Sequence, residues 1–214
     1  HRVFLIDNSK MIFLDLLREN NQVFSGVLSS IIDLYGKLRV GKKTRLIFRI
    51  PDIELEEAVL ERVEIDKISI RKHGSRRYRY VNVTDKKRIE RILGVIKPIN
   101  PERILEIAIY KKAISKERAK SIRESLEERF MKKISEVKEG NEKLNEPEPT
   151  ELDKAYLLGL ATGDLAVTQL GNKIMAELST THPEAMLLFH RMFDKYGKVT
   201  HIPRIARERG RTYI

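Results

Sequence analysis

The sequence predicts an α+β protein made of two copies of one unit, each with the order helix, hairpin, helix, hairpin, helix. Three observations lead to this expectation. Segments 23–36 and 155–165 are both rich in small and apolar residues. Each is followed by strand-like alternation, and Pro51 and Pro183 then stand at nearly the same spacing before a second helical pattern. A repeated order of this kind is typical of an internally duplicated fold.

The first copy spans 23–98. Its first helix, VFSGVLSSIIDLY, interleaves small residues that give a flat face for close helix packing. The strand TRLIFRI alternates apolar and basic residues, and Pro51 with Asp52 begins a helix in the manner expected of a first turn. The segments IDKISIRK and RRYRYVNV form a second hairpin. Asp85 is expected to cap a closing helix that stops before Pro98.

The rest of the chain divides into three further parts. Residues 1–22 form an N-terminal extension with one short helix. Residues 99–154 contain charged helices, expected to be solvated, and a polar, proline-containing linker. Residues 155–214 repeat helix, hairpin, helix and hairpin, so this second copy is expected to be incomplete because no closing helix follows.

Composition narrows the function classes. The chain has 214 residues, with 42 Lys and Arg against 31 Asp and Glu, and a formal net charge of +11. An anionic partner is expected, nucleic acid first; a membrane is disfavoured because no apolar run approaches the roughly 20 residues that span a bilayer. The absence of cysteine excludes disulfides, thiolate zinc sites and a cysteine nucleophile. A cytoplasmic protein is expected, and the 34% of charged residues hint at a thermophile.

Two segments carry a family resemblance. Residues 157–164, LLGLATGD, resemble the LAGLIDADG motif of homing endonucleases, with Gly159 at the first glycine and Asp164 at the terminal acid. Residues 28–36, LSSIIDLYG, are similar in weaker form: Ser30 takes the first-glycine position and Asp33 the inner acid, while Tyr35 stands at the terminal acid. The competing interpretation is a pair of close-packed core helices in an unrelated duplicated fold.

The resemblance implies an architecture and a chemistry. The two motif helices would pack at a pseudo-twofold axis through Ser29 or Ser30 and Gly159, in a monomer with two antiparallel saddle sheets that lie in the major groove of double-stranded DNA. Terminal acids would hold Mg²⁺ for phosphodiester hydrolysis. Asp164 is then both the catalytic residue and the metal ligand. Tyr35 offers only a neutral phenolic oxygen, so this acid position is degenerate and cleavage is expected to be impaired or limited to nicking.

The hairpins carry the basic side chains that such a groove contact needs. Between residues 37 and 49 there are six basic residues and no acid, which would repel one another without an anion to face. Tyr78 and Tyr80 alternate with arginines and are expected to face the core. The residues expected to bind nucleic acid are Lys37, Arg39, Arg45, Arg49, Lys67, Arg71, Arg77, Arg79, Lys198, Arg204, Arg207, Arg209 and Arg211.

Three functional hypotheses follow from different classes. The first is a site-specific DNA endonuclease, intact or reduced to nicking. The second is a non-cleaving descendant that binds DNA or structured RNA, as a regulator or intron maturase would; Tyr35 favours it, whereas the family resemblance favours the first. The third is an unrelated basic interaction protein whose charged helices at 101–139 bind a partner.

Overall fold

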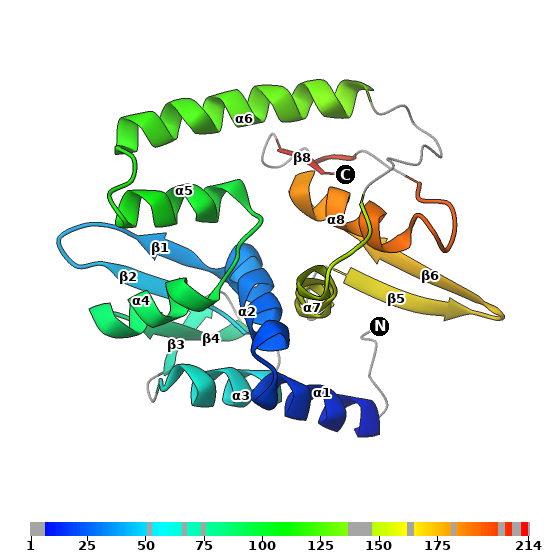
Figure 1. The fold of residues 1–214 in the computed structure, drawn as a ribbon, viewed down its shortest axis with the longest axis horizontal. Coiled ribbons are helices and arrows are strands. Elements are labelled where there is room, and N and C mark those ends of the chain that lie inside the picture. Colours follow the sequence, from blue (N-terminus) through cyan, green and yellow to red (C-terminus); the bar gives the residue numbers. More distant parts are fainter. Residues whose placement is uncertain are drawn as a thin grey trace.

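The structure, a computed structural model, describes residues 7–50, 53–65, 68–73, 76–136, 147–161, 165–180, 183–200, 204–206 and 211–213. It mixes helices with small antiparallel sheets, so the predicted α+β class is confirmed (Figure 1). The helices are α1 (Asp7–Glu19), α2 (Asn21–Tyr35), α3 (Ile53–Val63), α4 (Lys86–Val95), α5 (Pro101–Tyr110), α6 (Lys116–Glu136), α7 (Glu151–Leu160) and α8 (Pro183–Phe193). The strands are β1 (Lys37–Arg39), β2 (Arg45–Phe48), β3 (Ile68–His73), β4 (Arg76–Val83), β5 (Leu165–Leu170), β6 (Lys173–Leu178), β7 (Arg204–Ala206) and β8 (Arg211–Tyr213).

The N-terminal part, α1 to α4, is built around one four-stranded antiparallel sheet with the strand order β1-β2-β4-β3. The pairing of β2 with β4 joins the two predicted hairpins, through Leu46 opposite Val83 and Phe48 opposite Val81. These four side chains are buried. Because side chains alternate along a strand, the residues between them point to the other face of the sheet.

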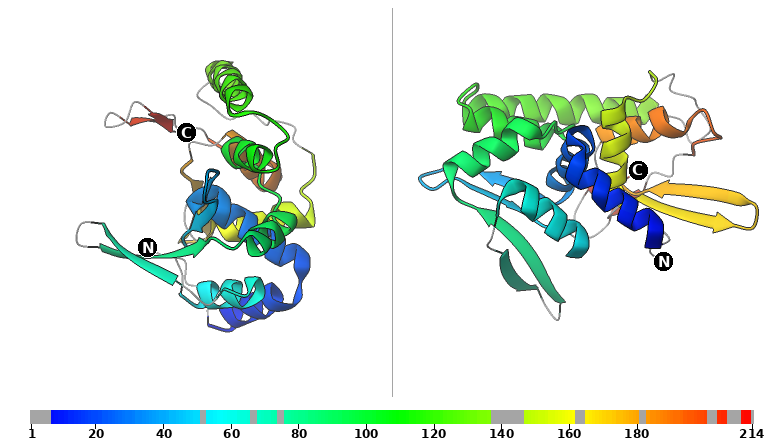
Figure 2. Two further views of the ribbon diagram at one scale, coloured as in Figure 1. Left: turned by 90° about the vertical axis from the view of Figure 1, so that its left-hand side faces the viewer. Right: turned by 60° about the horizontal axis from the view of Figure 1, so that its bottom comes forward.

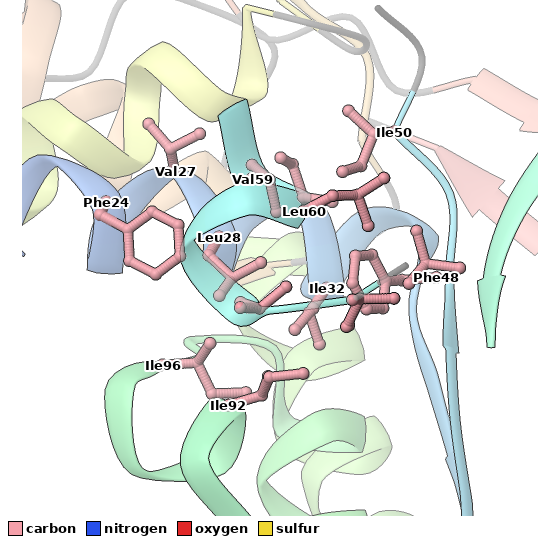
Figure 3. Packing of buried hydrophobic residues seen from close by; sticks show 14 of the residues in the cluster. Phe24, Val27, Leu28, Ile32, Phe48, Ile50, Val59, Leu60, Ile92 and Ile96 are labelled. Carbon is pink, nitrogen blue, oxygen red and sulfur yellow. The ribbon is translucent and has the colours of Figure 1, made fainter. Parts of the chain in front are cut away.

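Helices α2, α3 and α4 cover the apolar face of this sheet and complete the core. Figure 3 shows Ile32 of α2 beside Phe48 of β2, with Leu28 of α2, Val59 of α3 and Ile92 of α4 in the same cluster. Burial of side chains of this size stabilises the fold by about 1.5–3 kcal/mol each relative to exposure. The closing helix begins as predicted, since the side chain of Asp85 accepts a hydrogen bond from the backbone N–H of Arg88 at 2.9 Å.

The N-terminal extension contributes to this same core. Leu14 and Leu17 of α1 are buried in the cluster that contains the α2 and α3 side chains. Arg62 of α3 donates a hydrogen bond to the backbone oxygen of Leu17 at 2.9 Å and lies over the ring of Phe24, 4.3 Å from its centroid. Helix α1 is therefore a structural part of the N-terminal half, a role that its sequence pattern did not indicate.

Helices α5 and α6 differ in how they use their charges. Glu106 of α5 accepts a hydrogen bond from the backbone N–H of Leu38 at 2.8 Å and so binds the edge strand β1. Helix α6 pairs with α5 through Arg123 and Glu102 and buries Ala119, while most of its described side chains are exposed or half-buried. Among the described helices, none combines the length and the apolar character needed to cross a membrane.

The C-terminal part, α7 to β8, follows the predicted order of helix, hairpin, helix and hairpin. Its helix α7 begins at Glu151, before the predicted start at 155, because Thr150 and Asp153 form a capping box. The expected second saddle sheet is not formed by the described residues: β5 pairs with β6 and β7 with β8, in two separate sheets. The β5–β6 hairpin packs on α7 and α8 through Leu165, Val167, Ala176 and Leu178, and its far end projects away from the helices (Figures 1 and 2).

Candidate nucleic-acid interface

Helices α2 and α7 lie side by side in the middle of the molecule (Figures 1 and 2). A Cβ atom added to Gly159 would lie 1.6 Å from the Oγ of Ser30 and 3.0 Å from the backbone oxygen of Val27. A Cβ atom on Gly26 would lie 2.5 Å from the Cβ of Ala155. The two helices approach so closely because glycine occupies these positions, and the predicted meeting of Ser30 with Gly159 is found there.

Ser29 does not take part in this helix contact, contrary to one of the two predicted alternatives. Its Oγ donates to the backbone oxygen of Ser25 and accepts from the backbone N–H of Lys97 at 2.7 Å. The Oγ of Ser25 donates to the backbone oxygen of Val95 at 2.6 Å. The small residues of α2 therefore serve two faces, since Ser25 and Ser29 hold the end of α4 whereas Gly26 and Ser30 face α7.

Asp33 joins three parts of the chain at the far end of the same helix pair. Its Oδ2 accepts hydrogen bonds from the Tyr156 hydroxyl at 2.7 Å and from the backbone N–H groups of Ile99 and Asn100 at 2.8 and 3.1 Å. Burial raises the pKa of this carboxyl to about 6, although the hydrogen bonds from Tyr156 and the backbone oppose the shift. Asp33 is thus enclosed by α2, α7 and the start of α5, and its hydrogen bonds hold these three segments together.

Tyr35, at the predicted acid position, lies beneath an arginine. The guanidinium carbon of Arg49 is 4.8 Å from the centroid of the Tyr35 ring, and both side chains are half-buried. Tyr35 is the last residue of α2, and Arg49 directly follows β2, whose pairing with β1 begins at Lys37 opposite Ile47. A neutral phenol beside a cation does not fit Mg²⁺, which prefers carboxylate oxygens. Across the described ranges, no group of three or more His, Cys, Asp or Glu could hold a metal ion.

The outer face of the four-stranded sheet, opposite α2, α3 and α4, gathers exposed cations. Lys37, Arg39 and Arg45 are exposed on β1 and β2, and Arg39 stands directly opposite Arg45. None of these three forms an ion pair with a residue that the structure describes. Arg71 lies in β3, and its side chain is outside the described part of the chain. We call Lys37, Arg39 and Arg45 the basic row.

The register of β4 reverses the expected orientation of Arg79 and Tyr80. Val81 lies in the core, so Arg79 follows it on the helix-covered face, while Tyr80 shares the outer face with the basic row. The expectation that Tyr80 faces the core was therefore wrong, and Arg79 lies on the face opposite to the basic row. The side chains of Arg77 and Tyr78 lie outside the described part of the chain. The face taken by each residue of β4 could have been predicted from the sequence, because residues two apart in a strand share a face and Val81 and Val83 are apolar.

Arg79 has a structural partner on the helix-covered face. Its guanidinium lies 2.8 Å from the carboxylate of Glu56 on α3, whose side chain is 1% exposed. Burial raises the pKa of Glu56, and the nearby charge of Arg79 opposes that shift. The arginine therefore compensates a buried acid.

Replacing Arg79 with methionine is expected to lower the free energy of unfolding by about 1–3 kcal/mol, because the charge of Glu56 would be left without its partner while Arg79 itself is partly solvated. Urea denaturation measures this effect, and Arg45→Met on the exposed face is the matched control with little expected change. If Arg79→Met were as stable as the parent but bound nucleic acid more weakly, Arg79 would instead belong to the nucleic-acid-binding face.

The remaining predicted site residues lie in the C-terminal part or outside the described residues. Lys198 is exposed after α8. Arg204 lies in β7 and Arg211 in β8, and the side chains of both are outside the described part of the chain. The predicted residues outside the described ranges are Lys67, Asp164, Arg207 and Arg209.

Comparisons with known proteins gave no match from which a function could be assigned. No protein-family model matches the sequence, and no curated protein matches it. The geometry of the helix pair and of the outer sheet face is therefore the basis for a functional proposal.

Proposed function

We propose that this chain is a LAGLIDADG-type protein that binds double-stranded DNA with the outer face of its four-stranded sheet. The observation that carries the proposal is the basic row, a set of exposed cations on one face of an antiparallel ribbon. A β-ribbon with a polar, basic face fits the major groove, where it can reach both phosphates and base edges.

The charge arrangement favours an anionic ligand over a solvated surface. Arg39 and Arg45 are direct cross-strand neighbours, and like charges in such a pair destabilise a sheet. Lys42 and Lys43 in the connecting turn are also exposed, so together with Lys37 five cations gather at this hairpin. Phosphates of a duplex would neutralise them and release condensed counterions, which is the main source of affinity for DNA.

The helix pair supports the family within this proposal. The motif comparison matches Ser30 with Gly159, and four residues earlier it matches Gly26 with Ala155. These same pairs are the ones in contact between α2 and α7. Contact between equivalent positions is what a twofold axis produces, as in a symmetric dimer interface. An unrelated pair of core helices has no reason to meet in this way.

Tyr35 lies beside a cation and offers no carboxylate for Mg²⁺. The proposal is therefore limited to DNA binding, with cleavage of at most one DNA strand. Asp164 is the one terminal motif acid in the sequence, and it lies outside the described residues. A non-cleaving protein that binds structured RNA remains the second candidate, favoured by Tyr80 on the basic face, since aromatic side chains stack on unpaired bases.

Arg45→Ala tests the binding surface. It is expected to weaken binding to duplex DNA and to lower the slope of log affinity against log salt by about one, because one phosphate contact is lost. Fluorescence anisotropy with labelled duplexes from the protein's own genomic neighbourhood measures this, with structured RNA as competitor. Affinity independent of salt, or none at low salt, would contradict the proposal and favour a basic interaction protein. Stronger competition by RNA would favour the second candidate.

A further inference from the structure

We propose that the start of α4, the end of α5 and the start of α6 form a second basic surface, which binds the phosphate backbone of a duplex where it leaves the outer sheet face. This inference rests on the proposed DNA-binding function and extends it from the sheet to one end of the molecule. We call the residues of this second site the helix-end surface: Lys86, Lys87, Lys111, Lys112 and Lys116.

The helix-end surface lies next to the β1–β2 turn. Figure 1 shows the start of α4, the end of α5 and the start of α6 on the left, where this turn also projects, and the left panel of Figure 2 shows the same elements side by side. The Tyr110 hydroxyl donates a hydrogen bond to Glu90 at 3.5 Å and so joins the end of α5 to α4. Lys42 and Lys43 in the turn are exposed and follow directly on the basic row. The turn therefore connects the two basic surfaces.

The lysines of the helix-end surface can reach a ligand. All five are exposed, and all except Lys86 form no ion pair with a residue in the described ranges. Lys86 lies 3.7 Å from Glu90, with 80% of its own side chain exposed, and exposed pairs of this kind are weak. The other acids at these helix ends are Asp85, which caps α4, and Glu117. Positive charge therefore prevails at this end of the molecule.

The first turn of α4 holds its cations against the helix dipole. Lys86, Lys87 and Arg88 occupy this turn, which contains no acid. The N-terminal end of a helix carries partial positive charge, so acids are favoured there and cations are disfavoured. The Asp85 cap offsets only part of this charge. A bound phosphate would compensate both the lysines and the helix end, which gives these cations a function that the fold alone does not supply.

Lys112 adopts a backbone conformation that favours glycine. Its φ is +58°, and its N–H donates to the backbone oxygen of Ile109 at 3.0 Å. The N–H of Ala113 donates to the oxygen of Ala108 at 2.9 Å, which completes a Schellman motif at the end of α5. Glycine is usual at this position because a Cβ atom is crowded there. Lys111 already supplies a cation to the helix dipole, so a phosphate contact accounts for the second lysine.

Lys112→Gly tests the assignment through two readouts of opposite sign. Glycine relieves the backbone strain, so the midpoint of urea denaturation is expected to rise. The loss of one phosphate contact is expected to lower the slope of log affinity against log salt by about one on a long duplex. Lys87→Gln should lower that slope equally. Lys97→Gln, at an exposed position after the other end of α4, is the matched control and should leave the slope unchanged.

Two duplex lengths separate the two surfaces. The longest strand of the sheet, β4, has 8 residues and extends about 26 Å. A duplex of about 10 base pairs, roughly 34 Å long, therefore covers little more than the sheet, whereas one of about 30 base pairs reaches beyond it. Arg45→Ala is expected to lower the slope on both duplexes. Lys87→Gln and Lys112→Gly are expected to lower it on the long duplex alone.

The outcomes separate this inference from the function on which it rests. If Arg45→Ala lowers the slope and the two lysine variants leave it unchanged on the long duplex, the helix-end surface is overturned while DNA binding stands. If the affinity of the parent for both duplexes does not depend on salt, both proposals fail. A slope that the lysine variants lower for a structured RNA, but not for the long duplex, would assign the helix-end surface to RNA and overturn the duplex contact.

Discussion

Replacing Gly159 with leucine is expected to lower the free energy of unfolding by about 3 kcal/mol, the upper end of the usual cost of overpacking. Even the first side-chain atom would lie 1.6 Å from the Oγ of Ser30. The backbone oxygen of Val27, at 3.0 Å, cannot rotate away as a side chain can. Helices α2 and α7 would have to separate, and urea denaturation measures the loss.

A double-mutant cycle isolates the contact itself. Gly159→Ala should destabilise the protein, and Ser30→Gly in the same chain should recover part of the loss, because both the Oγ and the Cβ of Ser30 are then removed. Gly94 in α4 is the matched control, since a Cβ atom there would meet nothing within 4 Å. Gly94→Ala is expected to gain up to about 1 kcal/mol from helix propensity. Additive effects of the Gly159 and Ser30 changes would show that the two residues do not meet.

Local patterns predicted most of the fold. The alternation of apolar and basic residues located the β2 segment, and Asp85 marked the start of α4, because these signals depend on neighbours a few residues away. The flat face of α2 indicated close packing, and Ser30 with Gly159 followed from comparing the two motif segments. The late predicted start of α7 was an error of the same local kind, since the Thr150–Asp153 capping box was present in the sequence.

Features that depend on distant partners could not be predicted in this way. In RRYRYVNV the tyrosine is both apolar and polar, so residues 76–80 alone allow two phases. The valines Val81 and Val83 indicate one of them, and the pairing of β4 with β2 establishes it. The hydrogen bond between Asp33 and Tyr156 joins residues 123 positions apart, and no local sequence pattern near either residue predicts this contact. The separate hairpins of the C-terminal part likewise depend on where they pack, which periodicity does not encode.

Replacing Asp33 with alanine is expected to cost roughly 3–5 kcal/mol of unfolding free energy, because three buried donors would lose their acceptor at about 1–3 kcal/mol each. The donors are the Tyr156 hydroxyl and the backbone N–H groups of Ile99 and Asn100. Tyr156→Phe is the graded control: it removes one donor together with its need for a partner, so a loss of about 1 kcal/mol is expected. Equal losses in the two variants would contradict the three-donor arrangement.

The pH dependence of stability tests the same carboxyl without deleting it. The pKa of Asp33 is raised from 3.8 to about 6 in the folded protein, so the folded state holds a proton that the unfolded state releases. Its contribution to stability is therefore fully present below the unfolded pKa and is lost as the pH rises through the folded pKa. The two-unit difference corresponds to about 3 kcal/mol. Asp33→Asn keeps an acceptor oxygen but cannot ionise, so its stability relative to the parent should rise by this amount between about pH 3 and about pH 7.5. Parallel pH profiles of the parent and the variant would show that Asp33 ionises without cost in the folded state, and that the tie between α2 and α7 does not depend on its proton.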